Sequence, residues 1–252
     1  MRAAPLLLLL ALACDKKGDT DPDPWVPEEL GRCTAFDPVR VPLFGDTHIH
    51  TRYSLDANTQ GNRVSPAEAY RFARGETIGV HPHDANGDPL RQVQLARPLD
   101  WASLSDHAEF IGLVTTCRDP SLPGYDDPTC ARYRDNPDAA YLGLNIFTTL
   151  QPDRIYDPPL CEVDGVDCDA AGEVAWADMQ QAAEAAYDRT AACTFTSFVG
   201  YEWTGAPGSY NLHRNVIFRN ERVPELPVSY LDAPWVEELW SDLGAGCLDG
   251  LE

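Results

Sequence analysis

Short apolar runs alternate with amphipathic segments along most of the chain. The apolar runs that predict strands lie at 41–51, 99–105, 194–203 and 212–219. The segments that predict helices lie at 65–74, 172–189 and 233–243. The first helix opens with the capping box Ser65-Pro66-Ala67-Glu68 and stops at Gly75. Strands that alternate with helices favour an α/β layered or barrel fold over a sandwich.

The composition narrows the classes of protein that fit. Hydrophobic residues make up 44% of the 252 positions, and the formal net charge is −21. This hydrophobic content suits a folded domain and excludes a disordered acidic tail. Because a nucleic-acid backbone would repel so acidic a chain, we expect no nucleic-acid partner.

Residues 1–14 have the pattern of a bacterial lipoprotein signal peptide. A positive start and an apolar run lead to small residues directly before Cys14. The run is too short to span a bilayer, which needs about 20 apolar residues. We expect lipidation of Cys14, with an ordinary cleaved signal or a buried N-terminal helix as alternatives. Residues 15–39 are polar and Pro-rich, and predict a tether. The protein would then be a periplasmic or cell-surface lipoprotein that meets the membrane only through this anchor.

Export would place the cysteines in a compartment that permits disulfides. Apart from Cys14, seven cysteines remain, an odd number that leaves one thiol without a partner within this chain. Two local pairs are plausible, Cys117 with Cys130 and Cys161 with Cys168, although spacing alone leaves the connectivity open. These four lie within 117–170, a Pro- and Asp-rich stretch that has the character of a long insertion. The absence of a C-x-x-C pair argues against a zinc knuckle.

Imidazoles and carboxylates gather at the ends of the predicted strands. His48 and His50 form an H-x-H pair, and on a strand both side chains would point to the same face. His107 ends a second strand, Glu202 ends a third and His213 opens a fourth. A hydrolytic transition-metal centre requires this combination of ligands.

Each of these residues also has a simpler interpretation. An H-x-H pair can be a hydrogen-bonded surface pair, and an Asp-His dipeptide is often structural. Glu202 could pair with Arg214 or Arg219, and His213 alone could be a core histidine. Their shared position at strand ends favours a metal site. A second H-x-H pair, His81 and His83, lies in a stretch that we expect to be a solvated loop, with an accessory metal contact as the alternative.

Four segments resemble motifs of the polymerase-and-histidinol-phosphatase (PHP) superfamily. They are Phe44 to Ala57, Leu99 to Glu109, Val199 to Thr204 and Asn211 to Asn215. The resemblance covers about 40–252 and is closest to one branch, the domain of unknown function 3604. It implies a distorted (β/α)7 barrel with two or three divalent metal ions, Zn, Mn or Fe, at the carboxyl ends of the strands.

The resemblance also implies roles for individual residues. By position, the metal ligands would be His48, His50, Asp56, His107, Glu202 and His213. The candidate catalytic residues are Asp106, which would orient a ligand, and Arg214, which could hold a phosphate oxygen or form only a surface ion pair. The implied reaction is attack of a metal-bound hydroxide on a phosphoester, with the metals stabilising the attacking and leaving oxygens.

One departure from the family pattern affects these expectations. The family carries a further His and an Asp-x-His pair after the position of His213, whereas this sequence has no His beyond it. We therefore expect 40–252 to be the N-terminal part of such a domain, from a longer protein or a broken gene. The function that fits is an exported metal-dependent phosphoesterase with a small-molecule or ester substrate. The alternatives are a lipid-anchored binding protein without catalysis, or a metal hydrolase acting on a non-phosphate ester.

Overall fold

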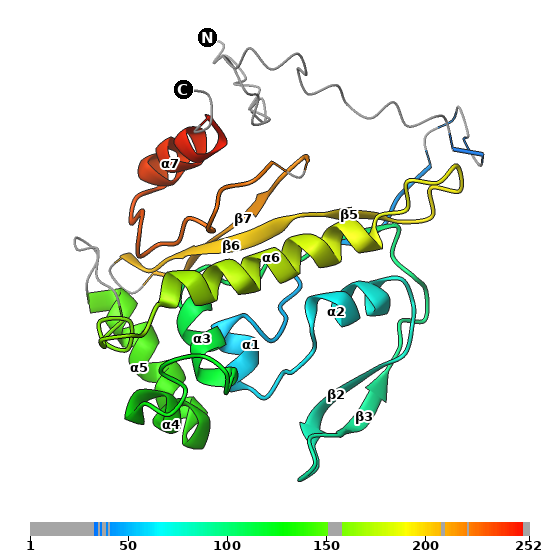
Figure 1. Ribbon diagram of the computed structural model, residues 1–252. Helices are drawn as coiled ribbons and strands as arrows, with labels where there is room; N and C mark the ends of the chain where they lie inside the picture. The colour runs from blue at the N-terminus through cyan, green and yellow to red at the C-terminus, as the bar shows by residue number, and fades with distance from the viewer. Residues whose placement is uncertain are drawn as a thin grey trace.

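The computed structural model describes residues 33–34, 36, 39, 41–150, 158–207, 210–220 and 222–248 (Figure 1). The predicted signal peptide, Cys14 and most of the predicted tether lie outside the described residues. The strands are β1 (Gly45–Asp46), β2 (Ile78–His83), β3 (Pro89–Val93), β4 (Trp101–Ser103), β5 (Thr196–Phe198), β6 (Gly200–Gly205) and β7 (Leu212–Ile217). The helices are α1 (Leu55–Thr59), α2 (Pro66–Ala73), α3 (Ile111–Arg118), α4 (Pro128–Asp135), α5 (Pro137–Leu150), α6 (Cys168–Ala186) and α7 (Val236–Leu248).

A small parallel sheet of order β1-β4-β5 lies at the centre of the fold. Gly45 pairs with Trp101, and Trp101 pairs in turn with Thr196, so the three strands start level with one another. The parallel arrangement extends beyond β4, because an isolated parallel bridge joins His107 to Glu202 on β6. The ends of these strands therefore stay side by side.

Two predicted strands differ from their expected extents. Of the stretch 41–51, only Gly45–Asp46 pairs as a strand, because the residues that follow leave the sheet toward α1. The stretch 194–203 divides into β5, which belongs to the parallel sheet, and β6, which pairs antiparallel with β7. The division falls beside Gly200, where an added Cβ would lie 2.5 Å from the hydroxyl of Ser103. Only glycine allows so close an approach.

The fold is mixed α/β, as the sequence predicts, but the expected barrel is not seen in the part of the chain that the structure describes. The strands there form three separate sheets of three, two and two strands. Successive strands of a (β/α) barrel run parallel and are joined by helices. Here β6 and β7 run antiparallel, and β2 and β3 form a hairpin apart from the central sheet. The strands therefore do not close around a common axis.

All three predicted helices form, α2 with nearly the expected bounds and α6 and α7 with shifted ones. The capping box of α2 is complete, since Ser65 accepts from the backbone of Glu68 and the Glu68 carboxylate accepts from the backbone of Ser65. The helix expected at 172–189 begins earlier, at Cys168, because Asp167 caps it by accepting from the Ala170 backbone. The stretch expected as a loop around His81 and His83 is instead strand β2, which β3 stabilises by pairing.

Among the residues that the structure describes, three disulfides fasten the peripheral segments to the domain. The two local pairs that the sequence suggested are confirmed as Cys117–Cys130 and Cys161–Cys168. A third bond, Cys33–Cys193, joins residues 160 positions apart. Disulfides persist in oxidising compartments, so the bonds indicate an environment outside the cytoplasm. No helix among the residues that the structure describes has the length and apolar character needed to cross a membrane.

The buried side chains form two adjoining clusters. The larger cluster lies between α6 and the strands and includes Trp176, Tyr201, Phe218 and Leu239. The smaller cluster holds α1, α3 and α4 together around the Cys117–Cys130 disulfide. Figure 1 shows α6 running alongside β5 and β6, so this helix supports the strands that carry the polar residues described below.

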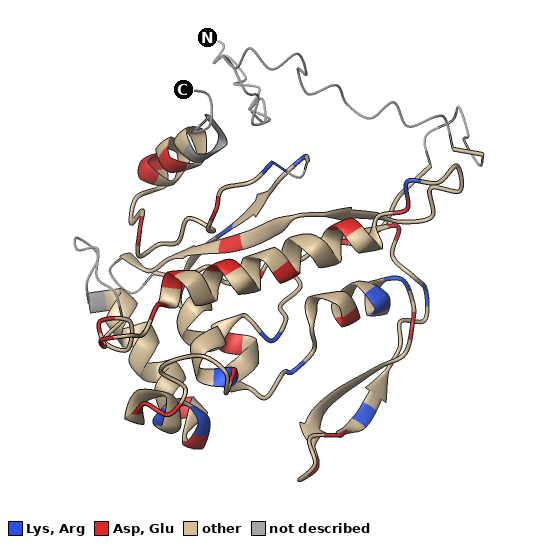
Figure 2. Ribbon diagram, in the orientation of Figure 1, with Lys and Arg blue, Asp and Glu red and all other residues tan. Residues whose placement is uncertain are grey.

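The excess of negative charge is spread over several elements. Figure 2 shows acidic residues along α6 and α7 as well as in α1, α2 and α4, with basic residues among them in α2, α4 and β3. The acidic residues are therefore not confined to one helix.

We expect Trp176 to be a principal contributor to folding stability. Its side chain is 1% exposed, its indole N–H donates to the carbonyl of Pro224 at 2.9 Å, and its ring meets Tyr201 edge-on. Trp176→Ala should lower the free energy of unfolding by about 3–5 kcal/mol, measured by urea denaturation. Val174→Ala is the control on the same helix, because Val174 is 57% exposed, and should change it by about 0.5 kcal/mol or less. Equal losses from the two variants would contradict the assignment of Trp176 to the core.

Candidate metal centre

The parallel strands bring polar residues from distant parts of the chain to one edge. His48 and His50 follow β1, His107 follows β4, and Glu202 lies on β6 beside His107. His213 reaches the same place from β7, because its antiparallel register sets it opposite Thr204. Crevices at the carboxyl ends of parallel strands are the usual binding sites of open α/β folds.

Backbone hydrogen bonds fix the segment that carries His48 and His50. The Asp46 carboxylate accepts from the backbone N–H of His48 at 2.8 Å, and the Ser105 hydroxyl accepts from the backbone N–H of Ile49 at 3.0 Å. The segment therefore follows β4 closely although it is not itself a regular strand.

Asp106 also fixes the segment that carries His48 and His50. Its carboxylate is fully buried and accepts from the backbone N–H and the hydroxyl of Thr51, at 2.5 and 2.7 Å. Burial raises the pKa of Asp106 to about 6, against the lowering effect of the bonds from Thr51. Asp106 thus fixes Thr51, the residue that follows His50. It also directly precedes His107 in the chain.

His50 lies between two carboxylates. Its Nδ1 is 3.0 Å from Asp56 Oδ1 and its Nε2 is 3.0 Å from Glu202 Oε2. Burial by itself would lower the pKa of His50, but the hydrogen bonds to Asp56 and Glu202 raise the pKa to about 10. The same contacts hold the pKa of Asp56 below its ordinary value despite the burial of that side chain. The two carboxylates therefore favour a positive charge between them.

Glu202 is the common neighbour of the histidines. Its side chain is 1% exposed, and its Oε2 lies 3.7 Å from Nε2 of His48 and 3.7 Å from Nδ1 of His107. His213 pairs with its other oxygen. Burial would raise the pKa of Glu202, but the hydrogen bond from His50 and the neighbouring imidazoles hold the pKa below its ordinary value. Glu202 thus presents an ionised carboxylate to all four rings.

His107 and His213 share one hydroxyl. The Oγ1 of Thr204 lies 2.8 Å from Nδ1 of His107 and 3.2 Å from Nδ1 of His213. The Nε2 of His107 is 3.9 Å from Asp56 Oδ2. Burial, together with the charge of His50, lowers the pKa of His107 to about 4. His107 is therefore held neutral, which is the form of histidine that binds metals.

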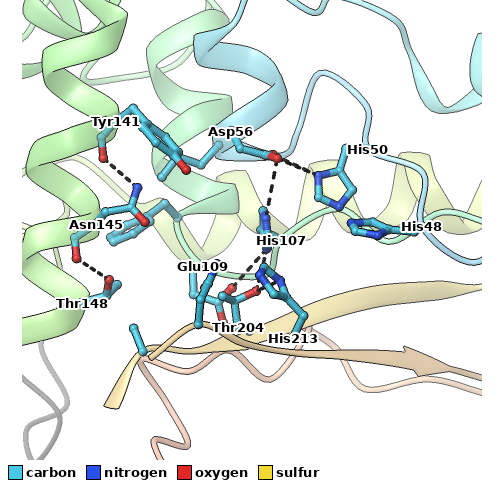
Figure 3. Close-up of a pocket in the computed structure, with 14 residues that line it drawn as sticks. His48, His50, Asp56, His107, Glu109, Tyr141, Asn145, Thr148, Thr204 and His213 are labelled. Atoms are coloured by element: carbon cyan, nitrogen blue, oxygen red, sulfur yellow. Dashed lines mark hydrogen bonds and ion pairs between the residues drawn. The ribbon is translucent and has the colours of Figure 1, made fainter. Parts of the chain in front are cut away.

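The structure brings together all six residues that the sequence suggested as metal ligands. Figure 3 shows five of them: His48, His50, Asp56, His107 and His213. The donor atoms of all six form three overlapping groups within which every pair lies within 4.8 Å: His48, His50 and Glu202; His50, Asp56 and His107; His107, Glu202 and His213. Imidazole and carboxylate donors fit Zn, Mn or Fe. Because three residues belong to two groups each, the site could hold ions that share ligands.

Five of these six residues, all except the buried Glu202, form the floor of a pocket of about 280 Å³. Its opposite wall is helix α5, which contributes Tyr141, Asn145 and Thr148, side chains that the sequence analysis did not single out (Figure 3). The helix comes from the stretch expected to be a loop-like insertion. No motif within 117–170 marks these three residues, so only the folded arrangement reveals them.

Glu109 is a second residue that sequence reasoning missed. It is 5% exposed and lines the pocket, and its Oε1 accepts from the backbone N–H groups of Thr204 and Tyr230 at 3.1 and 2.7 Å. Its Oε2 has no hydrogen-bond partner among the described residues. Burial raises the pKa of Glu109 to about 7. The available signal was its position two residues after His107.

Other residues singled out in the sequence lie away from the pocket. The guanidinium of Arg214 is exposed and donates to the carbonyl of His213 at 2.9 Å. Arg214 adjoins His213 on a strand, so the two side chains point to opposite faces. His81 and His83 lie on β2 and do not line the pocket. The predicted phosphate contact of Arg214 stays a prediction.

The hydrogen bond between Thr51 and Asp106 should contribute measurably to stability. Thr51→Val keeps the side-chain shape but removes one donor from a buried carboxylate. We expect the free energy of unfolding, measured in urea, to fall by about 1–3 kcal/mol.

The matched control for this variant is Thr149→Val on α5. The Thr149 hydroxyl donates to the carbonyl of Asn145 at an exposed position, 2.8 Å away. This change should cost about 0.5 kcal/mol at most. A loss from Thr51→Val no greater than the control's would show that Asp106 does not depend on this donor.

Comparison with known proteins adds a family assignment. Neither a curated protein nor a solved structure matches the chain. A protein-family model described as "Protein of unknown function (DUF3604)" matches residues 37–251. The match includes every candidate ligand and helix α5. The chain therefore belongs to the DUF3604 family.

Proposed function

We propose that the protein is an exported, divalent-metal-dependent hydrolase that cleaves phosphoesters. The observation that carries this proposal is the set of three overlapping nitrogen and oxygen donor groups at the floor of one pocket. Structural metal sites are usually closed by four ligands, whereas hydrolytic sites lie open to a substrate. Here the donors of His48 and His213 reach the exposed side of the cluster, with 62% and 37% of their side chains accessible.

We further propose that the family is a branch of the PHP superfamily and that the parallel strands β1, β4 and β5 are part of its distorted (β/α)7 barrel. Two features support this relationship: the parallel order β1-β4-β5 and the collection of ligands at the carboxyl ends of the strands. The four motif-like segments noted in the sequence supply the pocket floor.

The proposed reaction adds water across a phosphoester bond. A bond forms between the water oxygen and phosphorus, the bond from phosphorus to the alcohol oxygen breaks, and a proton ends on the released alcohol. Two or three bound divalent ions (Zn, Mn or Fe) would supply Lewis acidity that activates water and neutralises the phosphate charge.

The chain's own residues would prepare the site for this reaction. His48, His50, Asp56, His107, Glu202 and His213 would hold the ions. Glu202 would set the spacing between them, since it contacts every histidine of the cluster. Asp106 would position His50 through Thr51. Arg214 would contact a phosphate oxygen only after its side chain leaves the carbonyl of His213 and turns from the other face of β7 toward the pocket.

The first test measures bound metal and activity together. His50→Ala removes a residue that two donor groups share, so it should lower the metal bound per chain, measured by elemental analysis, and abolish metal-dependent hydrolysis of p-nitrophenyl phosphate. The control is His81→Ala, because His81 lies on β2 away from the pocket, and it should leave both quantities unchanged.

Two results would overturn the proposal. One is a protein that takes up no Zn, Mn or Fe from any supplied salt. The other is a metal-loaded protein that hydrolyses none of a panel of phosphate esters, which would favour the lipid-anchored binding protein. Hydrolysis of lactones or sulfate esters alone would favour a metal hydrolase of different substrate class.

We also propose that Cys14 is lipidated and anchors the protein to the outside of a membrane. The three disulfides support export from the cytoplasm. Cys14→Ser should abolish incorporation of labelled fatty acid and move the protein from the membrane fraction to the soluble fraction. Equal membrane association of the two forms would exclude the anchor.

A further inference from the structure

The side chains on the pocket wall opposite the metal ligands indicate which substrates the pocket can bind. Tyr141, Asn145 and Thr148 occur at intervals of four and three residues, so they follow one another along a single face of α5. Figure 3 shows them on the far side of the pocket from His48 and His213. A phosphate bound over the histidines would place its alcohol group toward this wall.

The helix that carries the wall is fixed to the domain. Phe147 packs against Phe110 with ring centroids 6.3 Å apart, and Ala140 and Leu144 pack against the smaller core cluster. These packing residues form the stripe of α5 next to the pocket-lining stripe. The wall is therefore held at a defined distance from the ligands and can select by shape and hydrogen bonding.

The hydrogen bonds already made within α5 leave acceptors facing the pocket. Thr148 donates its hydroxyl proton to the carbonyl of Asn145 at 2.9 Å, which leaves the hydroxyl oxygen able to accept. The amide nitrogen of Asn145 donates to the carbonyl of Tyr141 at 2.8 Å, which leaves the amide oxygen able to accept. Hydroxyl groups of a ligand would satisfy both acceptors.

The charge of the pocket argues against ligands that carry additional phosphate groups. None of the described residues that line it is Lys or Arg, and two of them, Asp56 and Glu109, are acidic. Proteins that bind polyphosphates rely on arginine or lysine for the additional phosphates. A negatively charged leaving group would meet no such partner on α5 and would be repelled by the carboxylates.

From these observations we propose that helix α5 selects the alcohol part of the substrate, and that this part is small, uncharged and rich in hydroxyl groups, as in a phosphorylated polyol or sugar. This inference rests on the proposed phosphoesterase function and adds the substrate class. Thr148 and Asn145 would be specificity-determining residues. The pocket volume of about 280 Å³ suits one such group and not a chain of several.

The first experiment compares two substrates that differ by one charged group. The metal-loaded protein should hydrolyse the 6-phosphate of glucose 6-phosphate with kcat/KM at least about tenfold higher than that of glucose 1,6-bisphosphate. The rate on p-nitrophenyl phosphate, measured in parallel, reports the proposed function independently of the sugar.

The second experiment uses variants of α5. Thr148→Val and Asn145→Leu should each lower kcat/KM for glucose 6-phosphate, relative to p-nitrophenyl phosphate, about fivefold to tenfold. Thr149→Val is the matched control, because Thr149 bonds to the same carbonyl of Asn145 but does not line the pocket. Isothermal titration with the phosphonate analogue of glucose 6-phosphate, which has no ester to cleave, should show the same order of affinities.

The outcomes separate the two proposals. Hydrolysis of p-nitrophenyl phosphate with equal or greater activity on the bisphosphate would overturn the substrate class and leave the phosphoesterase in place. Equal effects of Thr148→Val and Thr149→Val on the phosphonate affinity would remove α5 from substrate selection. Absence of metal-dependent hydrolysis on every substrate would overturn the proposed function, and this inference with it.

Discussion

The carboxylate of Asp106 lies where water does not reach it and receives two hydrogen bonds from Thr51. Without either donor, a buried charged oxygen would lack a hydrogen bond, which costs far more free energy than one ordinary hydrogen bond contributes. The segment after β1 is therefore confined to one path although it has almost no strand pairing of its own. That path determines where His48 and His50 lie relative to β4 and β6.

The site as a whole concentrates negative charge that the fold has to compensate. Asp106, Glu109 and Glu202 are all buried within a few residues of the strand ends. Each has different hydrogen-bond partners: Thr51 for Asp106, two backbone N–H groups at Oε1 for Glu109, and imidazoles for Glu202. Only the last arrangement uses groups that can equally well bind a cation. The chain thus separates the carboxylates that maintain the backbone from the carboxylate that is available to a metal.

Local signals predicted the local features of this fold. The capping box of α2 and the two short disulfide loops depend on residues close in sequence, and the structure confirms them. Most candidate ligands were recognisable because they lie at the ends of predicted strands, whereas Asp56 was indicated only by the family resemblance. The α/β class followed from the alternation of periodic segments, whereas strand direction did not, since nothing in residues 212–219 specifies antiparallel pairing with β6.

Features that depend on distant contacts were not predictable. The stretch around His81 and His83 has the Pro, Asn and Gly residues that usually mark turns, and pairing of β2 with the exposed strand β3 overrides that tendency. Tyr141, Asn145 and Thr148 gain a role only because Phe147 docks α5 beside the histidines. The bond between Cys33 and Cys193 likewise requires the folded chain, since 160 positions separate the two residues.

The Cys33–Cys193 disulfide also determines which end of the domain lies next to the N-terminal segment. Cys193 lies just before β5, at the amino end of the parallel strands, and Thr34 adds a hydrogen bond to Ala191 beside it. The first described residues accordingly lie at the opposite end of the sheet from α5 (Figure 1). A force applied to the N-terminal segment would act on this disulfide before it reached the strand ends. A molecule attached to a surface through its N-terminus would therefore hold helix α5 and the strand ends at the end of the sheet farther from the attachment.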